Sequence, residues 1–255
     1  MMTIAFLTML EQWRQRTPWG FLVVGALMAL PALLPVDGMH VNGAQMQGMG
    51  ILDGLLGFAQ FVAVFLTIAT ASGLVANDRE RGTLLLLITK PLPRYQVLLG
   101  KLAGACAFML LVWLCWGAIA ALALGFKFGS AIMLPTLTGF AASCLTSWLL
   151  IAFCLFWSCF LPANSTMGLG VLGWLAATIA PKIAMAANAW GKPIAARAFE
   201  GLHWALPTDV LSDAAKQLAA GETPEKAAYA AILAIAAWWL ASTLVFSQRD
   251  LAPRD

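Results

Sequence analysis

Long apolar runs separated by short polar segments dominate the sequence. A helix needs roughly 20 mostly apolar residues to cross a membrane, and six runs reach or approach that length. The expected spans are residues 19–35, 54–76, 102–126, a stretch within 131–161 that starts after Pro135, 164–180 and 227–246. The last is preceded by Thr223 and Pro224, a pair typical of a helix start. The pattern predicts an all-α polytopic membrane protein with six transmembrane helices.

The segment before the first expected span is amphipathic. It contains two sets of side chains. The apolar set is Ile4, Phe6, Leu7, Leu10 and Trp13, and the polar set is Glu11, Gln12, Arg14 and Gln15. This favours an N-terminal helix over residues 1–18 that lies in the membrane interface, in contact with lipid. A basic segment before a short apolar run also fits a signal peptide. A true span is favoured, because only a sixth crossing brings both termini to the same side.

Composition supports the membrane assignment. Hydrophobic residues make up 61% and charged residues 11%, against roughly 45–50% and about 25% in soluble proteins. Mean hydropathy is +0.83. These values exclude a water-soluble enzyme and a disordered chain, and the long runs argue against a β-barrel. A net charge of +3 is too small to indicate nucleic-acid binding. The five cysteines lie in apolar runs without a CxxC pair, as buried thiols do.

Lysine and arginine set the expected orientation. With the N-terminus inside, the inner segments hold nine of them, whereas the short outer loops at residues 37–53 and 127–130 hold only Lys127. The positive-inside rule therefore places both termini in the cytoplasm. Residues 181–226 then form a long extracytoplasmic segment.

The six expected spans contain no Asp, Glu, Lys, Arg or His. Carriers driven by protons or ions usually keep such residues at depth as relays or binding sites. The same absence argues against an intramembrane enzyme. Energy for any transport is therefore expected to come from another protein.

The most specific segment is the inner loop at residues 77–101. It is expected to leave the second span, turn at Gly82 and continue as a short helix that ends at Pro91. Residues 84–88 are apolar but too short to cross a bilayer, and charges flank them. Such a helix either packs under the protein's own spans or docks on a soluble partner.

The loop resembles that of type 2 permease subunits of ATP-binding-cassette (ABC) exporters. The resemblance rests on acidic-x-acidic-x-Gly-Thr-Leu, then Pro, Arg and Gly100-Lys101 at the next span, together with the N-terminal helix and the six spans. It implies a cytoplasmic coupling helix between spans two and three that docks on the ATPase subunit. The matching residues are Asp78, Glu80, Gly82, Thr83, Pro91 and Arg94. Asp78 stands where the family more often has Glu.

The resemblance also implies partners and cofactors. Two ATPase subunits, which carry ATP and Mg, would move the coupling helices of two permease copies, expected to form a homodimer. The phosphate-binding pattern GxxxxGK[ST] is absent from this chain. We therefore expect no ATPase activity from this chain alone.

Within the family, the loop and Pro207-Thr208-Asp209 are similar to the permease of nitrous oxide reductase maturation, which serves a periplasmic copper enzyme. The first outer loop holds residues that suit Cu(I), namely Met39, His40, Met46 and Met49. Methionines that fill apolar gaps or adapt to partner surfaces explain the same loop without a metal. Asp53 and His203 carry no motif, and solvated or capping roles are expected for them.

The long outer segment is expected to be helical over residues 194–219. Leu211, Ala214, Ala215 and Leu218 share one face of that helix, and Trp190 and Trp204 suit the membrane interface. The helix could form a lid, receive a periplasmic partner, or be a packed connector. A partner there would suit an alternative function, that of an ATPase-driven membrane assembly factor that transports nothing.

Overall fold

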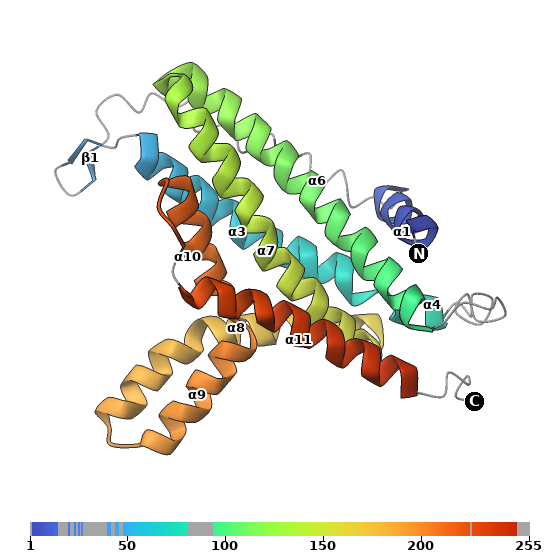
Figure 1. The fold of residues 1–255 in the computed structure, drawn as a ribbon. Coiled ribbons are helices and arrows are strands. Elements are labelled where there is room, and N and C mark those ends of the chain that lie inside the picture. The colour runs from blue at the N-terminus through green and yellow to red at the C-terminus, as the bar shows by residue number, and fades with distance from the viewer. Residues whose placement is uncertain are drawn as a thin grey trace.

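The computed structural model describes residues 2–14, 20, 23, 25, 27, 40–41, 44–45, 48–80, 94–224 and 226–248, which are mostly helical (Figure 1). The elements in order are α1 (Met2–Arg14), β1 (His40–Val41), β2 (Ala44–Gln45), α3 (Gly48–Ser72), α4 (Ala76–Glu80), α6 (Arg94–Phe128), the 3-10 turn η1 (Ser130–Ile132), α7 (Met133–Ser158), α8 (Ala163–Ala189), α9 (Pro193–Ala205), α10 (Thr208–Ala219) and α11 (Lys226–Gln248). The two short strands pair antiparallel, His40 with Gln45 and Val41 with Ala44.

Four stretches are long and apolar enough to cross a membrane. They are Met49–Asp78, Tyr95–Phe128, Ser130–Ser158 and Ala163–Ala189. A shorter apolar stretch, Ile232–Phe246, lies inside α11. The expected first span at residues 19–35 falls almost entirely outside the described residues. The chain is thus a multi-pass helical membrane protein, and six spans remain a prediction.

Several expected boundaries are wrong. α7 starts at Met133 and includes Pro135 in its first turn, where proline is tolerated because the amide would lack a helical acceptor anyway. α8 does not stop at Ala180 but runs through Pro181 to Ala189, because a stripe of buried alanines continues past the proline. That stripe is Ala177, Ala180, Ala184 and Ala187. α11 begins at Lys226, so Pro224 lies outside it.

The helices extend beyond the apolar runs, so they contain charges that the expected spans did not. The 35 residues of α6 measure about 50 Å at 1.5 Å per residue, against a hydrocarbon core of roughly 30 Å. Lys101 therefore lies within α6, close to its start. Asp53 lies within α3, near its start and exposed, as expected for a solvated residue.

α7 is the central helix of the bundle. It packs against α3, α6, α8, α10 and α11, and it is the most deeply buried of the four candidate spans. Trp113 of α6 sits edge-on to Phe140 of α7, and its indole Nε1 donates to Ser147 Oγ at 2.9 Å. A Cβ added to Gly117 would lie 2.9 Å from Phe140 Cβ, so this glycine permits the close approach of α6 and α7.

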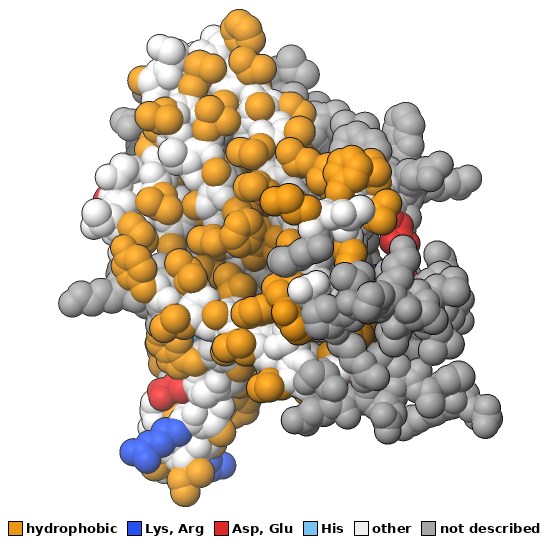
Figure 2. Space-filling view, turned by 45° about the vertical axis from the view of Figure 1, so that its right-hand side comes forward, with side chains coloured by type: hydrophobic (Ala, Val, Ile, Leu, Met, Phe, Trp, Pro, Cys, Tyr) orange, Lys and Arg blue, Asp and Glu red, His pale blue; other side chains and the backbone are white. Residues whose placement is uncertain are grey.

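The outside of the bundle is strongly apolar. One face carries hydrophobic side chains over most of its area, whereas lysines and arginines in view gather at its lower end (Figure 2). α8 is the least covered candidate span, and Leu172, Leu175 and Ile179 on it are exposed. An apolar surface of this extent requires lipid or another protein against it.

The bundle has two distinct ends (Figure 1). The loop end holds α4, the start of α6 and the ends of α7 and α11, and α1 lies on the same side; the opposite end holds β1, β2 and the turn between α6 and α7. That turn is made by Gly129, whose φ of +90° favours glycine. The described ends of the chain thus lie toward the same end of the bundle.

The outer segment forms two helices instead of one. The expected helix over residues 194–219 is broken at Leu206 and Pro207 into α9 and α10, because proline disfavours a helical conformation in the residue before it. α10 buries Leu211, Ala214 and Ala215 as expected, but Leu218 is exposed. α10 packs on α7, as a connector would, whereas α9 pairs with α8 in a hairpin that projects from the bundle (Figure 1).

Candidate functional site at the base of the loop

The structure describes the two ends of the predicted coupling loop. Asp78 and Glu80 lie in α4, and Arg94 is the first residue of α6. Gly82, Thr83 and Pro91 lie outside the described residues, as do the expected turn at Gly82 and the helix ended by Pro91. The described part of the site is therefore its base, formed by the residues on either side of positions 81–93.

The entry into the loop is a break in the helix that α3 and α4 would otherwise form together. α3 ends at Ser72, and the turn at residues 73–75 precedes α4. The amide of Leu74 bonds to Ala71 O at 3.2 Å, which is the tighter spacing of a 3-10 turn. This turn redirects the chain toward α4 and the loop.

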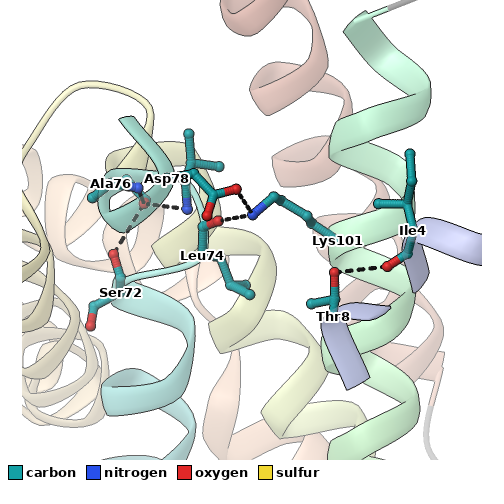
Figure 3. Close-up of polar contacts among 9 residues, drawn as sticks. Ile4, Thr8, Ser72, Leu74, Ala76, Asp78 and Lys101 are labelled. Carbon is teal, nitrogen blue, oxygen red and sulfur yellow. Dashed lines mark hydrogen bonds and ion pairs between the residues drawn. The ribbon is translucent and has the colours of Figure 1, made fainter. Parts of the chain in front are cut away.

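Ser158, the last residue of α7, holds the break. Its hydroxyl accepts hydrogen bonds from the amides of Val75 (3.2 Å) and Ala76 (3.0 Å) and donates one to Ser72 O at 3.0 Å (Figure 3). The side chain is fully buried. These bonds satisfy three backbone groups inside the protein, where a group left unpaired costs about 1–3 kcal/mol.

Lys101 joins the exit of the loop to its entry. Its ammonium, on α6, pairs with the Asp78 carboxylate and donates to Leu74 O (Figure 3). The side chains of Lys101 and Asp78 are only 7% and 15% exposed. Because Asp78 precedes residues 81–93 and Lys101 follows them, this pair closes the loop at its base.

α1 docks on the same part of α6. Figure 3 places Ile4 and Thr8 beside the stretch of α6 that carries Lys101, and a Cβ on Gly104 would lie 2.5 Å from Ala5 O. Thr8 and Gln12 are buried, whereas Phe6, Leu7 and Leu10 are exposed. The helix thus buries Thr8 and Gln12 against the protein and exposes large apolar side chains, as a helix in contact with lipid does.

Sequence reasoning found part of this site. It singled out Asp78, and it quoted Lys101 only as part of a motif. It missed Ser158, because a serine at the end of an apolar run looks like any residue at a span boundary. No spacing in the sequence connects Ser158 with residues 72–76, more than 80 positions earlier.

The predicted metal site is only partly described. His40 lies in β1 and Met49, 41% exposed, lies in α3, whereas Met39 and Met46 fall outside the described residues. Over the described ranges, no group of three or more His, Cys, Asp or Glu side chains is placed to hold a metal ion. Copper binding by the methionines and His40 stays a prediction.

His203 has a structural partner near the end of α9. Its Nδ1 lies 3.4 Å from Asp209 Oδ1 in the first turn of α10, and its ring lies edge-on to Trp204. The pair spans the break at Leu206 and Pro207. The structure thus places His203 at the junction of two helices, with its side chain only 15% exposed instead of solvated.

The geometry of the base suits mechanical work. Where the loop begins and ends, the buried ion pair joins α4 to α6, and the buried Ser158 hydroxyl joins α7 to the turn between α3 and α4. α1 packs on α6 beside them. A force applied to the loop would therefore act on several membrane helices at once.

Comparison with known proteins gives the family. No curated protein matches the chain. Residues 3–251 match the ABC-2 family transporter proteins, whose members are permease subunits that associate with an ABC ATPase. The match covers nearly the whole chain, from α1 to beyond the end of α11, so this protein belongs to the ABC-2 family of transporter membrane proteins.

Proposed function

We propose that this protein is the permease subunit of an export-type ABC transporter in the bacterial inner membrane, with both termini cytoplasmic. The loop at residues 81–93 docks in a groove of a separate ATPase subunit, which binds ATP and Mg and hydrolyses the ATP. Two permease copies and two ATPase subunits form the working complex. The chain itself catalyses no reaction.

The observation that supports this function best is the closed base of the loop. Asp78 and Lys101 tie its two ends together, and Ser158 ties its entry to the central helix α7. Such a connection would pass a displacement of the loop on to the membrane helices. The proposed docking residues are Asp78, Glu80, Gly82, Thr83, Pro91 and Arg94.

A pull-down with matched variants tests the docking. The tagged permease, isolated from native membranes in mild detergent, should carry an ATPase subunit in about equal amount. Glu80→Ala should lower ATPase recovery, because Glu80 lies at the entry to the loop. The control Glu200→Ala changes an exposed glutamate on α9 and should recover ATPase as the wild type does. Equal recovery with both variants would contradict docking through the loop.

A second proposal concerns the task of the complex. The resemblance to the nitrous oxide reductase maturation permease suggests a role in maturation of a periplasmic copper enzyme, with Cu(I) bound near Met39, His40, Met46 and Met49. The α8–α9 hairpin favours the alternative of a membrane assembly factor, because its exposed Met185, Trp190 and Ile194 offer a surface for a periplasmic partner. ATP-dependent accumulation of substrate in sealed vesicles would separate transport from assembly.

A further inference from the structure

Ser158 occupies the place of a missing helical hydrogen bond. In a continuous helix the amide of Ala76 would bond to Ser72 O, four residues earlier. Here the Ser158 hydroxyl accepts from that amide at 3.0 Å and donates to that carbonyl at 3.0 Å. A side chain inserted into the ladder in this way opens a helix and bends it. The break between α3 and α4 is therefore held open by a residue of α7.

Lys101 fixes the same turn from a different helix. Its ammonium, on α6, contacts Leu74 O inside the turn and the Asp78 carboxylate just beyond it. A turn held only by its own backbone could act as a free hinge and absorb a displacement of the loop. This turn is instead fastened on two sides, to α7 by Ser158 and to α6 by Lys101.

We propose that Ser158 and Lys101 are positioning residues of the permease, which make α6 and α7 move with the loop when the ATPase displaces it. The inference rests on the proposed function and adds the residues and helices that carry the movement. Since α7 packs against α3, α6, α8, α10 and α11, a shift of its loop end reaches most of the described bundle. Its 26 residues extend about 39 Å, enough to reach the opposite end.

The variant Ser158→Ala tests the connection directly. Without the hydroxyl, the amide of Ala76 can bond to Ser72 O itself, so α3 and α4 can close into one helix that no longer contacts α7 through this bond. The matched control is Ser143→Ala. Ser143 is also a buried serine of α7, but its hydroxyl donates only to Gly139 O of its own helix.

A spin label at the end of α7 opposite the loop reports whether a displacement of the loop moves that end of the helix. Leu134→Cys offers an exposed position there, in a background with the exposed Cys115 changed to Ala. Electron paramagnetic resonance spectra of the complex with its ATPase are recorded without nucleotide and with ATP plus vanadate. The difference between the two spectra is the nucleotide-dependent change. The nucleotide-dependent change should appear in the wild type and in Ser143→Ala, and should fall by about fivefold or more in Ser158→Ala, while ATPase recovery stays the same. Ser158→Thr, which keeps a hydroxyl, should restore part of the change.

Several results would overturn the inference. One is a full spectral change in Ser158→Ala; another is a wild-type complex whose ATPase is bound but whose label does not respond to nucleotide. If Ser158→Ala does not fold, Lys101→Met takes its place, with the spin label at the exposed Leu122 of α6. An undiminished nucleotide-dependent spectral change at that label would also overturn the inference. A wild-type permease recovered without ATPase would instead refute the proposed function, and the inference with it.

Discussion

At the scale of single residues, the ion pair between Lys101 and Asp78 combines burial with opposite charge. Their side chains are 7% and 15% exposed, so water screens the pair little. Removing one member of a buried pair costs about 3–5 kcal/mol, whereas removing both costs much less. Removing Lys101 alone should therefore cost far more stability than removing one member of a surface pair, because the Asp78 charge stays buried without Lys101.

A comparison of single and double variants tests how the stability depends on this ion pair. Lys101→Met should lower the unfolding temperature clearly, because it takes the ammonium away from the Asp78 carboxylate and from Leu74 O. The double variant Asp78→Asn with Lys101→Met should recover much of that loss. Thermal unfolding in detergent, followed by intrinsic tryptophan fluorescence, measures both.

The control for this comparison is Lys216→Met. Lys216 pairs with Asp213 on α10 at 3.4 Å, but the two side chains are 41% and 68% exposed. Exposed pairs contribute about 0–1 kcal/mol, so little change is expected. A loss in Lys101→Met no larger than in Lys216→Met would contradict the expected penalty for breaking the buried pair.

At the scale of elements, the packing of α1 on α6 depends on one glycine. A Cβ at Gly104 would lie 2.5 Å from Ala5 O and 2.8 Å from Thr8 Cβ, distances that force the backbone of α1 to move. Overpacking of this kind costs about 1–3 kcal/mol. Gly104→Ala should therefore loosen α1 while leaving the rest of the bundle folded.

Hydrogen exchange measures that loosening. Amides of residues 2–14 should exchange faster in Gly104→Ala by about 5-fold to 150-fold, the equivalent of that energy. Gly168→Ala on α8 is the control, because a Cβ there meets nothing within 4 Å. Unchanged exchange in α1 would mean that α1 is not held by its contact with α6.

The elements also show what the sequence could predict. Apolar runs gave the helices that contain the second to fifth spans, because a run of about 20 apolar residues has few alternatives to a membrane helix. Boundaries were less predictable: Pro135 and Pro181 are tolerated inside helices, while Pro207 marks a real break. Whether a proline ends a helix depends on the packing beyond it, which a local pattern does not contain.

The site was less predictable than the fold. Asp78 belongs to a motif and could be singled out, whereas Ser158 acts through three bonds to residues 72–76. Those bonds exist only because α7 ends beside the break after α3. A contact of this kind is a product of tertiary packing, and no periodicity in the sequence encodes it.

At the scale of the whole molecule, the two ends of the bundle predict the two sides of the membrane. α1 and the end of α11 lie toward the loop end, and the turn at Gly129 lies at the opposite end (Figure 1). If the loop meets a cytoplasmic ATPase, the turn must face the periplasm. α1 and β1 then lie toward opposite sides, as a span at residues 19–35 requires.

Cysteine labelling tests the orientation. In the Cys115→Ala background, Ser130→Cys next to the turn should react with an impermeant maleimide from outside intact cells with a permeable outer membrane. Met2→Cys, at a residue that is 90% exposed, should react only in inverted vesicles. Labelling of both positions from the same side would contradict the proposed topology.

The insertion of Ser158 between Ser72 and Ala76 has a consequence for biosynthesis. The hydroxyl that opens the break is made 82 residues after Ala76, a delay of about 4–16 s at 5–20 residues per second. Until then Ser158 cannot hold α3 and α4 apart, so the loop leaves the ribosome before its connection to α7 can form. A permease truncated before α7 should therefore lack the connection between its loop and the central helix, so that a movement of the ATPase would not yet reach the rest of an unfinished membrane domain.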